Sequence, residues 1–146
     1  MASHRTNRFL PYSQAQLFGL VADVESYPQF LPMWQGARIW RLPGNVEDIY
    51  RTEQSIQLGP VNKRFITETR MRHPNQIDVT SNDALFSHFL ICWRFEDLQQ
   101  QGCRINFSMD CEARSLLLKP VMEVVLTETS RAIVSAFERR AHRLFG

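Results

Sequence analysis

The C-terminal stretch, residues 115–145, constrains the fold more than any other part of the sequence, because it has the pattern of one long amphipathic helix. It contains no glycine, and its single proline is Pro120. Proline is accepted only in the first turn of a helix, so we expect a helical turn at 115–119 and the main helix from about Pro120. The apolar side chains of one helix face recur in steps of three, four or their sums: Leu118, Met122, Val125, Ile133, Ala136, Phe137, Ala141 and Leu144.

Upstream of this helix, from residue 36, the apolar period changes to two, which is typical of β-strands. The strand candidates are 36–42, 46–58, 62–72, 76–82, 87–98 and 102–114. Short breaks separate them, which favours antiparallel hairpins. The last candidate alternates without error: Cys103, Ile105 and Phe107 begin one face, and charged or polar residues occupy the other. One dry face and one wet face are therefore expected.

The first 35 residues add a short strand and two short helices. Residues 4–10 alternate weakly and are expected to form an edge strand. Ser13 is a good N-cap for a helix at 14–23. Residues 25–32, in which Pro28 and Pro32 bracket residues 29–31, indicate a second, very short helical segment.

A helix of about 25 residues spans about 37 Å, so it needs a large apolar surface. An antiparallel sheet of about seven strands supplies one, and a twisted sheet curls around the helix that covers it. The predicted fold is α+β, a helix grip, in a single domain over residues 1–146.

Composition narrows the function. The formal net charge is only +2, which gives no electrostatic footprint for nucleic acid, and we expect no DNA partner. No apolar run approaches the roughly 18 residues of a membrane span, and the first ten residues lack the apolar core of a secretory signal, so we expect a cytoplasmic protein. The three cysteines are expected to be reduced and buried.

Catalytic and metal-binding patterns are scarce. The sequence contains no HExxH, no GxSxG and no glycine-rich phosphate loop. The four histidines are expected on the surface, and the cysteines and Ser87 lack an evident base. We therefore expect no catalytic residues, no metal and no cofactor.

The residues that alternate onto the inward face of the predicted sheet include both apolar and polar side chains. Large apolar residues (Leu58, Phe65, Trp93, Phe107, Met109) alternate with small or polar ones (Thr52, Gln54, Thr67, Thr69, Ser81). Buried hydroxyls and amides need partners, and a mostly apolar wall with a few polar groups is typical of a ligand cavity. The alternative is a filled core whose polar positions lie near solvent at strand ends, and the sequence leaves both open.

The sequence resembles a known family over essentially its whole length. The residues that carry the resemblance are Pro11-Tyr12-Ser13, Gln16-Leu17-Phe18, Leu20-Val21, Asp23-Val24, Ser26-Tyr27-Pro28-Gln29-Phe30-Leu31-Pro32, Gly36, Arg38-Ile39, Trp93-Arg94-Phe95, Phe137, Arg140-Ala141 and Leu144. They resemble the ubiquinone-binding (coenzyme Q-binding) family of the START-like, polyketide cyclase/dehydrase superfamily, which includes bacterial ribosome association toxins. Two segments depart from the family pattern: Met33-Trp34-Gln35 stands where relatives often carry Pro-Trp-Cys, and Asp83-Ala84-Leu85-Phe86 where they tend to have Asp-Gly-Pro-Phe.

The resemblance implies a START-like, Bet v 1-like helix grip with an elongated hydrophobic cavity under the C-terminal helix. The implied function is to hold a polyprenyl quinone or another lipid and to hand it to quinone-biosynthesis or respiratory proteins, with peripheral contact at the inner membrane. Ligand-binding residues are then expected on the cavity wall: Phe30, Trp34, Tyr50, Phe65, Phe86, Trp93, Phe107, Val121, Met122 and Val125. The second half of the helix, with Ile133, Phe137 and Leu144, is expected to anchor it by tight packing.

Two other functions stay open. A polyketide aromatase/cyclase would need polar residues such as Tyr50, Gln54 and Thr67 to converge in the cavity. A protein that binds the ribosome, or acts in a toxin–antitoxin pair, could use the exposed arginines Arg64, Arg70 and Arg72, which are able to contact RNA phosphates.

Overall fold

The fold follows the predicted order of elements. The computed structural model describes residues 2–41, 48–58 and 60–146, with the side chains of residues 2, 41, 58, 61 and 121–129 outside the description. The elements are β1 (Ala2–Leu10), α1 (Gln14–Ala22), η1 (Val24–Gln29), β2 (Trp34–Arg41), β3 (Ile49–Leu58), β4 (Val61–Arg72), β5 (Gln76–Thr80), β6 (Phe86–Asp97), η2 (Gln99–Gln101), β7 (Cys103–Ala113) and α2 (Lys119–Phe145). The predicted strand ends at 42 and 46 lie outside the described residues.

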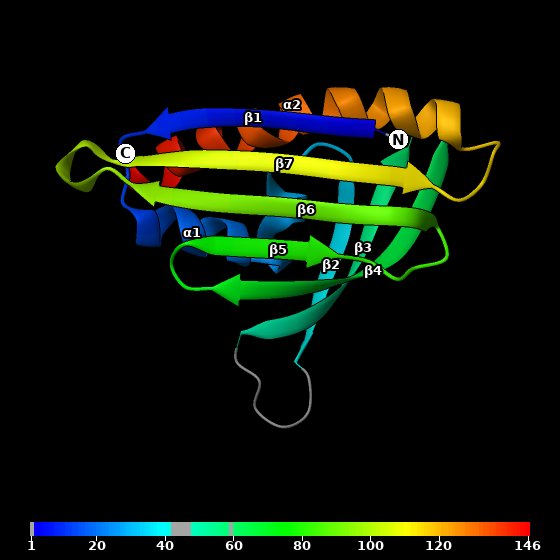
Figure 1. Ribbon diagram of the computed structural model, residues 1–146, viewed down its shortest axis with the longest axis horizontal. Helices are drawn as coiled ribbons and strands as arrows, with labels where there is room; N and C mark the ends of the chain where they lie inside the picture. The colour runs from blue at the N-terminus through cyan, green and yellow to red at the C-terminus, as the bar shows by residue number, and fades with distance from the viewer. Residues whose placement is uncertain (1, 42–47, 59) are drawn as a thin grey trace.

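The strands form one antiparallel sheet in the order β1-β7-β6-β5-β4-β3-β2. In Figure 1, β1, β7 and β6 run side by side while β2 and β3 cross steeply behind them, so the sheet is strongly curled. The helices α1 and α2 lie on the same side of the sheet. The predicted α+β helix grip is therefore confirmed.

Helix α1 is fixed at both ends by side chains. The Ser13 hydroxyl accepts from the Gln16 backbone N–H (3.1 Å) and the Gln16 side chain accepts from the Ser13 N–H (3.0 Å), a capping box. At the other end the Tyr50 hydroxyl donates to the Ala22 carbonyl (2.9 Å) and the Tyr27 hydroxyl donates to the Val21 carbonyl. The two tyrosines thus satisfy carbonyls that the end of a helix leaves unpaired.

Helix α2 begins after a turn in which the Ser115 carbonyl accepts from the N–H groups of Leu118 and Lys119 (3.2 and 3.1 Å). Its buried row, which includes Ile133, Phe137 and Ala141, advances in steps of four. The prediction that Leu144 belongs to this row was wrong, because Leu144 is 51% exposed. The next step of four reaches Phe145, whose ring lies 5.6 Å from that of Tyr12.

Phe137 stands at the centre of the core between the helices and the sheet. Its ring centroid lies 5.4 Å from that of Tyr27, 5.1 Å from that of Phe30 and 5.0 Å from that of Trp93, all edge to face. Edge-to-face aromatic pairs add to the stability that burial alone gives. The second half of α2 is therefore the anchor that the sequence predicted, apart from Leu144.

Candidate functional site: a cavity between sheet and helices

A cavity of about 80 Å³ lies between the inward face of the sheet, η1 and α2. A water molecule needs roughly 10–15 Å³ of such space, so the cavity holds several times that. Its described lining is Val24, Tyr27, Leu31, Met33, Trp34, Gln54, Ile56, Phe65, Thr69, Val79, Phe86, Phe89, Ile91, Trp93, Phe107, Met109, Ile133 and Phe137. The wall is therefore almost entirely aromatic and aliphatic.

Five of the predicted ligand-binding residues lie on this wall. They are Trp34, Phe65, Phe86, Trp93 and Phe107, and they come from β2, β4, β6 and β7. The structure brings them together from strands far apart in the sequence. Contact between these side chains and a ligand stays a prediction.

The other predicted wall residues fall into two groups. Tyr50 is buried, and its hydroxyl donates to the Ala22 carbonyl at the end of α1. Phe30 packs edge to face against Phe137, and the Arg140 guanidinium lies over its ring at 5.2 Å. Neither residue is in the described lining, so their contact with a ligand stays a prediction. The side chains of Val121, Met122 and Val125 lie outside the described residues.

The sequence also missed much of the wall contributed by η1 and by the segment after it, including Val24, Leu31 and Met33. The available signal was the apolar density of residues 27–34, which is high for a connection between elements. That density showed that the segment is packed. It did not show against what.

A buried hydrogen-bond cluster closes one part of the wall. The Trp34 indole N–H donates to Gln54 Oε1 (2.7 Å), and Gln54 Nε2 donates to Thr52 Oγ1 (3.0 Å) and Thr67 Oγ1 (3.2 Å). The two threonine hydroxyls also bond to each other. An indole nitrogen can only donate, so the amide oxygen of Gln54 must face Trp34.

The polar inward positions are therefore deep in the protein. Thr52, Gln54, Thr67 and Thr69 are all buried, so the alternative that they lie near solvent was wrong. Ser81 differs: it follows the end of β5, is half-buried, and donates to the Ile66 carbonyl at 2.5 Å.

Tyr27 is the only ionisable residue in the described lining. Burial raises the pKa of its hydroxyl well above the ordinary value, and the neighbouring Tyr50 and Asp23 add to that shift. The hydroxyl therefore stays protonated at neutral pH and donates to Val21. Within the described residues, no group of three His, Cys, Asp or Glu side chains could hold a metal ion, and no helix is long and apolar enough to cross a membrane.

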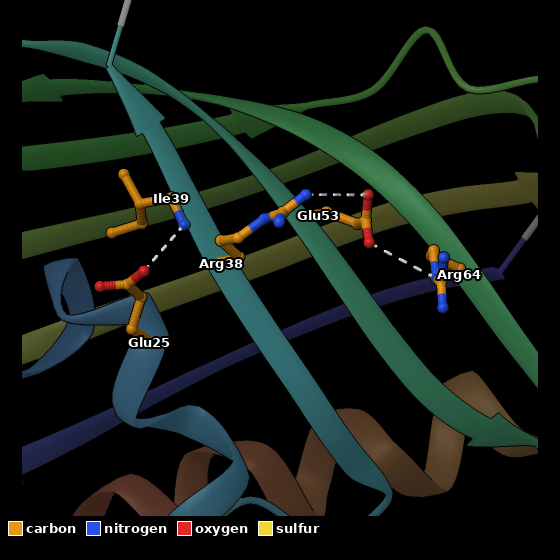
Figure 2. Close-up of polar contacts among 5 residues, drawn as sticks. All are labelled: Glu25, Arg38, Ile39, Glu53 and Arg64. Atoms are coloured by element: carbon orange, nitrogen blue, oxygen red, sulfur yellow. Dashed lines mark hydrogen bonds and ion pairs between the residues drawn. The ribbon is translucent and has the colours of Figure 1, made fainter.

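The outer face of β2, β3 and β4 is basic. The strand register places Arg38, Arg51, Arg64, Arg70 and Arg72 on this face, together with Glu53 and Glu68. Figure 2 shows Glu53 between two of the arginines, 3.8 Å from Arg38 Nη2 and 3.5 Å from Arg64 Nε. Trp40, 36% exposed, lies under the Arg38 guanidinium at 4.6 Å.

The edge strand β2 is also tied to η1. The carboxylate of Glu25 accepts a hydrogen bond from the Ile39 backbone N–H at 3.1 Å (Figure 2). An unpaired N–H at the edge of a sheet is a site for unwanted pairing with another chain. Glu25 therefore satisfies a backbone donor at this edge and ties η1 to β2.

Comparison with known proteins places these features in a family. The profile of the family described as "Polyketide cyclase / dehydrase and lipid transport" matches residues 10–138. The ribosome association toxin RatA of Escherichia coli K12 is 32% identical over 137 residues, 93% of this chain and 84% of that protein. The mitochondrial coenzyme Q-binding protein COQ10 homolog B of Xenopus laevis is 28% identical over 144 residues, 96% of this chain and 58% of that protein.

Solved structures share the fold. The ZhuI aromatase/cyclase from Streptomyces sp. R1128 superposes with a TM-score of 0.83 at 13% identity, over 97% of this chain and 93% of that one. The solution structure of CC1736 from Caulobacter crescentus gives a TM-score of 0.75 at 27% identity, over 99% of this chain and 98% of that one. The family profile covers most of the sequence, and the toxin and the coenzyme Q-binding protein align over nearly all of it. The chain therefore belongs to the polyketide cyclase/dehydrase and lipid transport family.

Proposed function

We propose that this protein is a non-enzymatic carrier that holds a ubiquinone-like polyprenyl lipid between its sheet and α2, in support of quinone biosynthesis or respiratory electron transport. The observation that carries the proposal is the cavity itself, an aromatic and aliphatic wall with few polar groups. Ligand sites for apolar molecules have this composition. The similarity to a protein named for coenzyme Q binding points to the same class of ligand.

The size of the cavity limits how such a ligand binds. The volume of about 80 Å³ is below the roughly 300–1,000 Å³ of cavities that enclose drug-sized molecules. A polyprenyl quinone is much longer than this space. Binding therefore places one part of the ligand in the cavity and requires α2 or η1 to move outward for the rest.

The wall chemistry favours binding over acid–base catalysis. Gln54 and Thr67 do converge, but their hydrogen bonds are made to each other and to Thr52 and Trp34. The Tyr50 hydroxyl donates to the Ala22 carbonyl, and Tyr27 keeps its proton. An aromatase/cyclase would need a group that exchanges protons at the reacting atoms, and the described lining offers none.

A direct test combines ligand identification with a blocked cavity. Native mass spectrometry of protein purified from its own host should show a prenylquinone or related lipid, and decylubiquinone should quench the fluorescence of Trp34 and Trp93, which line the cavity. Val79→Trp fills the cavity from β5 and should abolish the quenching. Thr80→Trp, at the next and exposed position of the same strand, should not. Repeated absence of any lipid, with no binding of added quinone, would refute the proposal.

A second candidate function is supported by the outer face. The cluster of Arg38, Arg51, Arg64, Arg70 and Arg72 is suited to phosphate contacts, and the chain resembles proteins named for ribosome association. We expect co-sedimentation with large ribosomal subunits that weakens as salt rises. Arg64→Glu should reduce it, while Arg143→Glu on exposed α2 should not; equal effects of both substitutions would remove this face from the interaction.

A further inference from the structure

We infer that the hydroxyl of Thr69 is a hydrogen-bond donor that orients the ligand in the cavity, so that the preferred ligand carries an acceptor oxygen, a carbonyl or an ether, on an otherwise apolar body. This inference rests on the proposed binding function and makes it more specific. It follows from an account of every hydrogen-bonding side chain on the described wall.

Five side chains of the described lining can donate a hydrogen bond: Tyr27, Trp34, Gln54, Thr69 and Trp93. The Tyr27 hydroxyl donates to the Val21 carbonyl, and the Trp34 indole donates to Gln54. Both amide hydrogens of Gln54 are directed to the threonine hydroxyls of Thr52 and Thr67. Three of the five donors are thus committed to protein acceptors, which leaves the Thr69 hydroxyl and the Trp93 indole N–H.

Thr69 differs from the three committed donors, and its hydroxyl, unlike the indole of Trp93, can also accept a hydrogen bond. It is 2% exposed and lines the cavity, yet its hydroxyl has no hydrogen bond to any residue that the structure describes. Buried hydroxyls are nearly always paired. The Thr69 oxygen is not among the fully enclosed unpaired atoms of the described residues, which are Asp78 Oδ1 and Arg140 Nε, so it keeps some accessible surface. A donor held in this state at an apolar wall is a position where a ligand oxygen gains a partner and the protein gains a satisfied group.

The neighbouring position on the same strand gives an internal reference. Thr67 points to the same side of β4 two residues earlier and is equally buried, but its hydroxyl is bonded to Thr52 and Gln54. The two threonines have the same chemistry, strand and burial. They differ in that the oxygen of Thr67 is used by the protein and that of Thr69 is left for the cavity.

The two positions also make opposite predictions for the protein without ligand. Thr69→Val replaces an unpaired hydroxyl with a methyl group of nearly the same shape, so the melting temperature should stay the same or rise. Thr67→Val removes an acceptor from Gln54 and should lower it. A loss of stability in Thr69→Val as large as that in Thr67→Val would show that the Thr69 hydroxyl is structural and would overturn the inference.

The binding test uses two probes with the same ten-carbon tail: decylubiquinone, which carries carbonyl and ether oxygens, and decylbenzene, which carries none. Quinone binding is followed by tryptophan quenching, and decylbenzene by its displacement of the quinone. Thr69→Val should weaken quinone binding about 2- to 12-fold, the range that one neutral hydrogen bond contributes. It should leave decylbenzene binding unchanged, Thr69→Ser should retain quinone binding, and Thr80→Val is the surface control.

The possible outcomes distinguish a failure of the inference about Thr69 from a failure of the proposed carrier function. If the wild type binds both probes and Thr69→Val binds the quinone equally well, the inference about Thr69 is wrong and the carrier function stands. If Thr69→Val weakens both probes to the same extent, the substitution has changed the shape of the cavity and the inference is also wrong. If the wild type binds neither probe, the carrier function itself fails.

Discussion

The inward face of the sheet has two halves that differ in the kind of side chain they bury. On β6 and β7 the inward residues are apolar, among them Trp93, Phe107 and Met109, and they pack against α2. On β3 and β4 the inward residues include Thr52, Gln54 and Thr67, which satisfy one another. Both halves border the cavity, the first through aromatic and aliphatic side chains and the second in part through Gln54, whose hydrogen bonds are made within the polar cluster.

The largest expected effect comes from the packed half. Phe137→Ala should lower the free energy of unfolding by about 3–5 kcal/mol, as for other buried phenylalanines, because it removes the ring that contacts Tyr27, Phe30 and Trp93. Urea denaturation measures it. Leu144→Ala, on the exposed side of the same helix, should change stability by no more than about 0.5 kcal/mol. Similar losses for both variants would show that the second half of α2 is not the anchor.

The next effect tests the hydrogen-bonded half. Thr67→Val should cost about 1–3 kcal/mol, the range for leaving a buried polar partner unsatisfied, because Gln54 and Thr52 both lose a bond. Thermal unfolding of this variant should be compared with that of Thr80→Val, an exposed threonine of β5. If the two variants melt at the same temperature, the polar cluster contributes nothing to stability. The two halves would then differ only in which residue types they contain.

The smallest expected effect on stability at neutral pH involves the thiols of β7. This effect grows as the pH rises. Burial raises the pKa of Cys111 to about 12, and burial, with Asp97 and Glu96 nearby, raises that of Cys103 to about 11. A folded-state pKa raised above 9.0 gives stability that is complete below pH 9 and is lost as pH rises toward 11–12. Both thiols should therefore resist alkylation in the folded protein at pH 8.

The control for the thiol prediction is the unfolded chain, in which all three cysteines should react at similar rates. Cys111→Ala should flatten the alkaline decline of stability. A decline of the same steepness in Cys111→Ala would assign the pH dependence to other groups. Rapid labelling of Cys103 or Cys111 in the native protein would show that the packed half opens far more often than its burial indicates.

Local patterns in the sequence were enough to predict the helices and strands and the buried face of each. The alternation from Cys103 to Ala113 predicted the buried side of β7, and Ser13 followed by Gln16 predicted the start of α1. Strand ends were predicted to within a few residues wherever the structure describes them. These features depend on neighbours within one turn or one strand, so the sequence contains all the information they need.

The site was predicted only in part, because its residues meet through the curvature of the sheet. The parity of β3 placed Tyr50 and Gln54 on the same inward side, yet Tyr50 reaches the end of α1 and Gln54 reaches the cavity. Likewise Phe30 was expected on the wall, but it lies against Phe137 on the side of Arg140. The alternation along a strand predicts on which side of the sheet a side chain lies. It does not predict which element that side chain contacts.

The sequence by itself therefore determined the helix grip: a long apolar helix face, an apolar sheet face to receive it, and the polar residues buried between them. Only the tertiary structure decided which of those polar groups pair. Thr67 and Thr69 are indistinguishable in the sequence, two threonines on one face of one strand, and the bond that separates them is made by Thr52 and Gln54 on the neighbouring strand β3. That pairing depends on how the strands are placed across the curled sheet, and no local pattern encodes it.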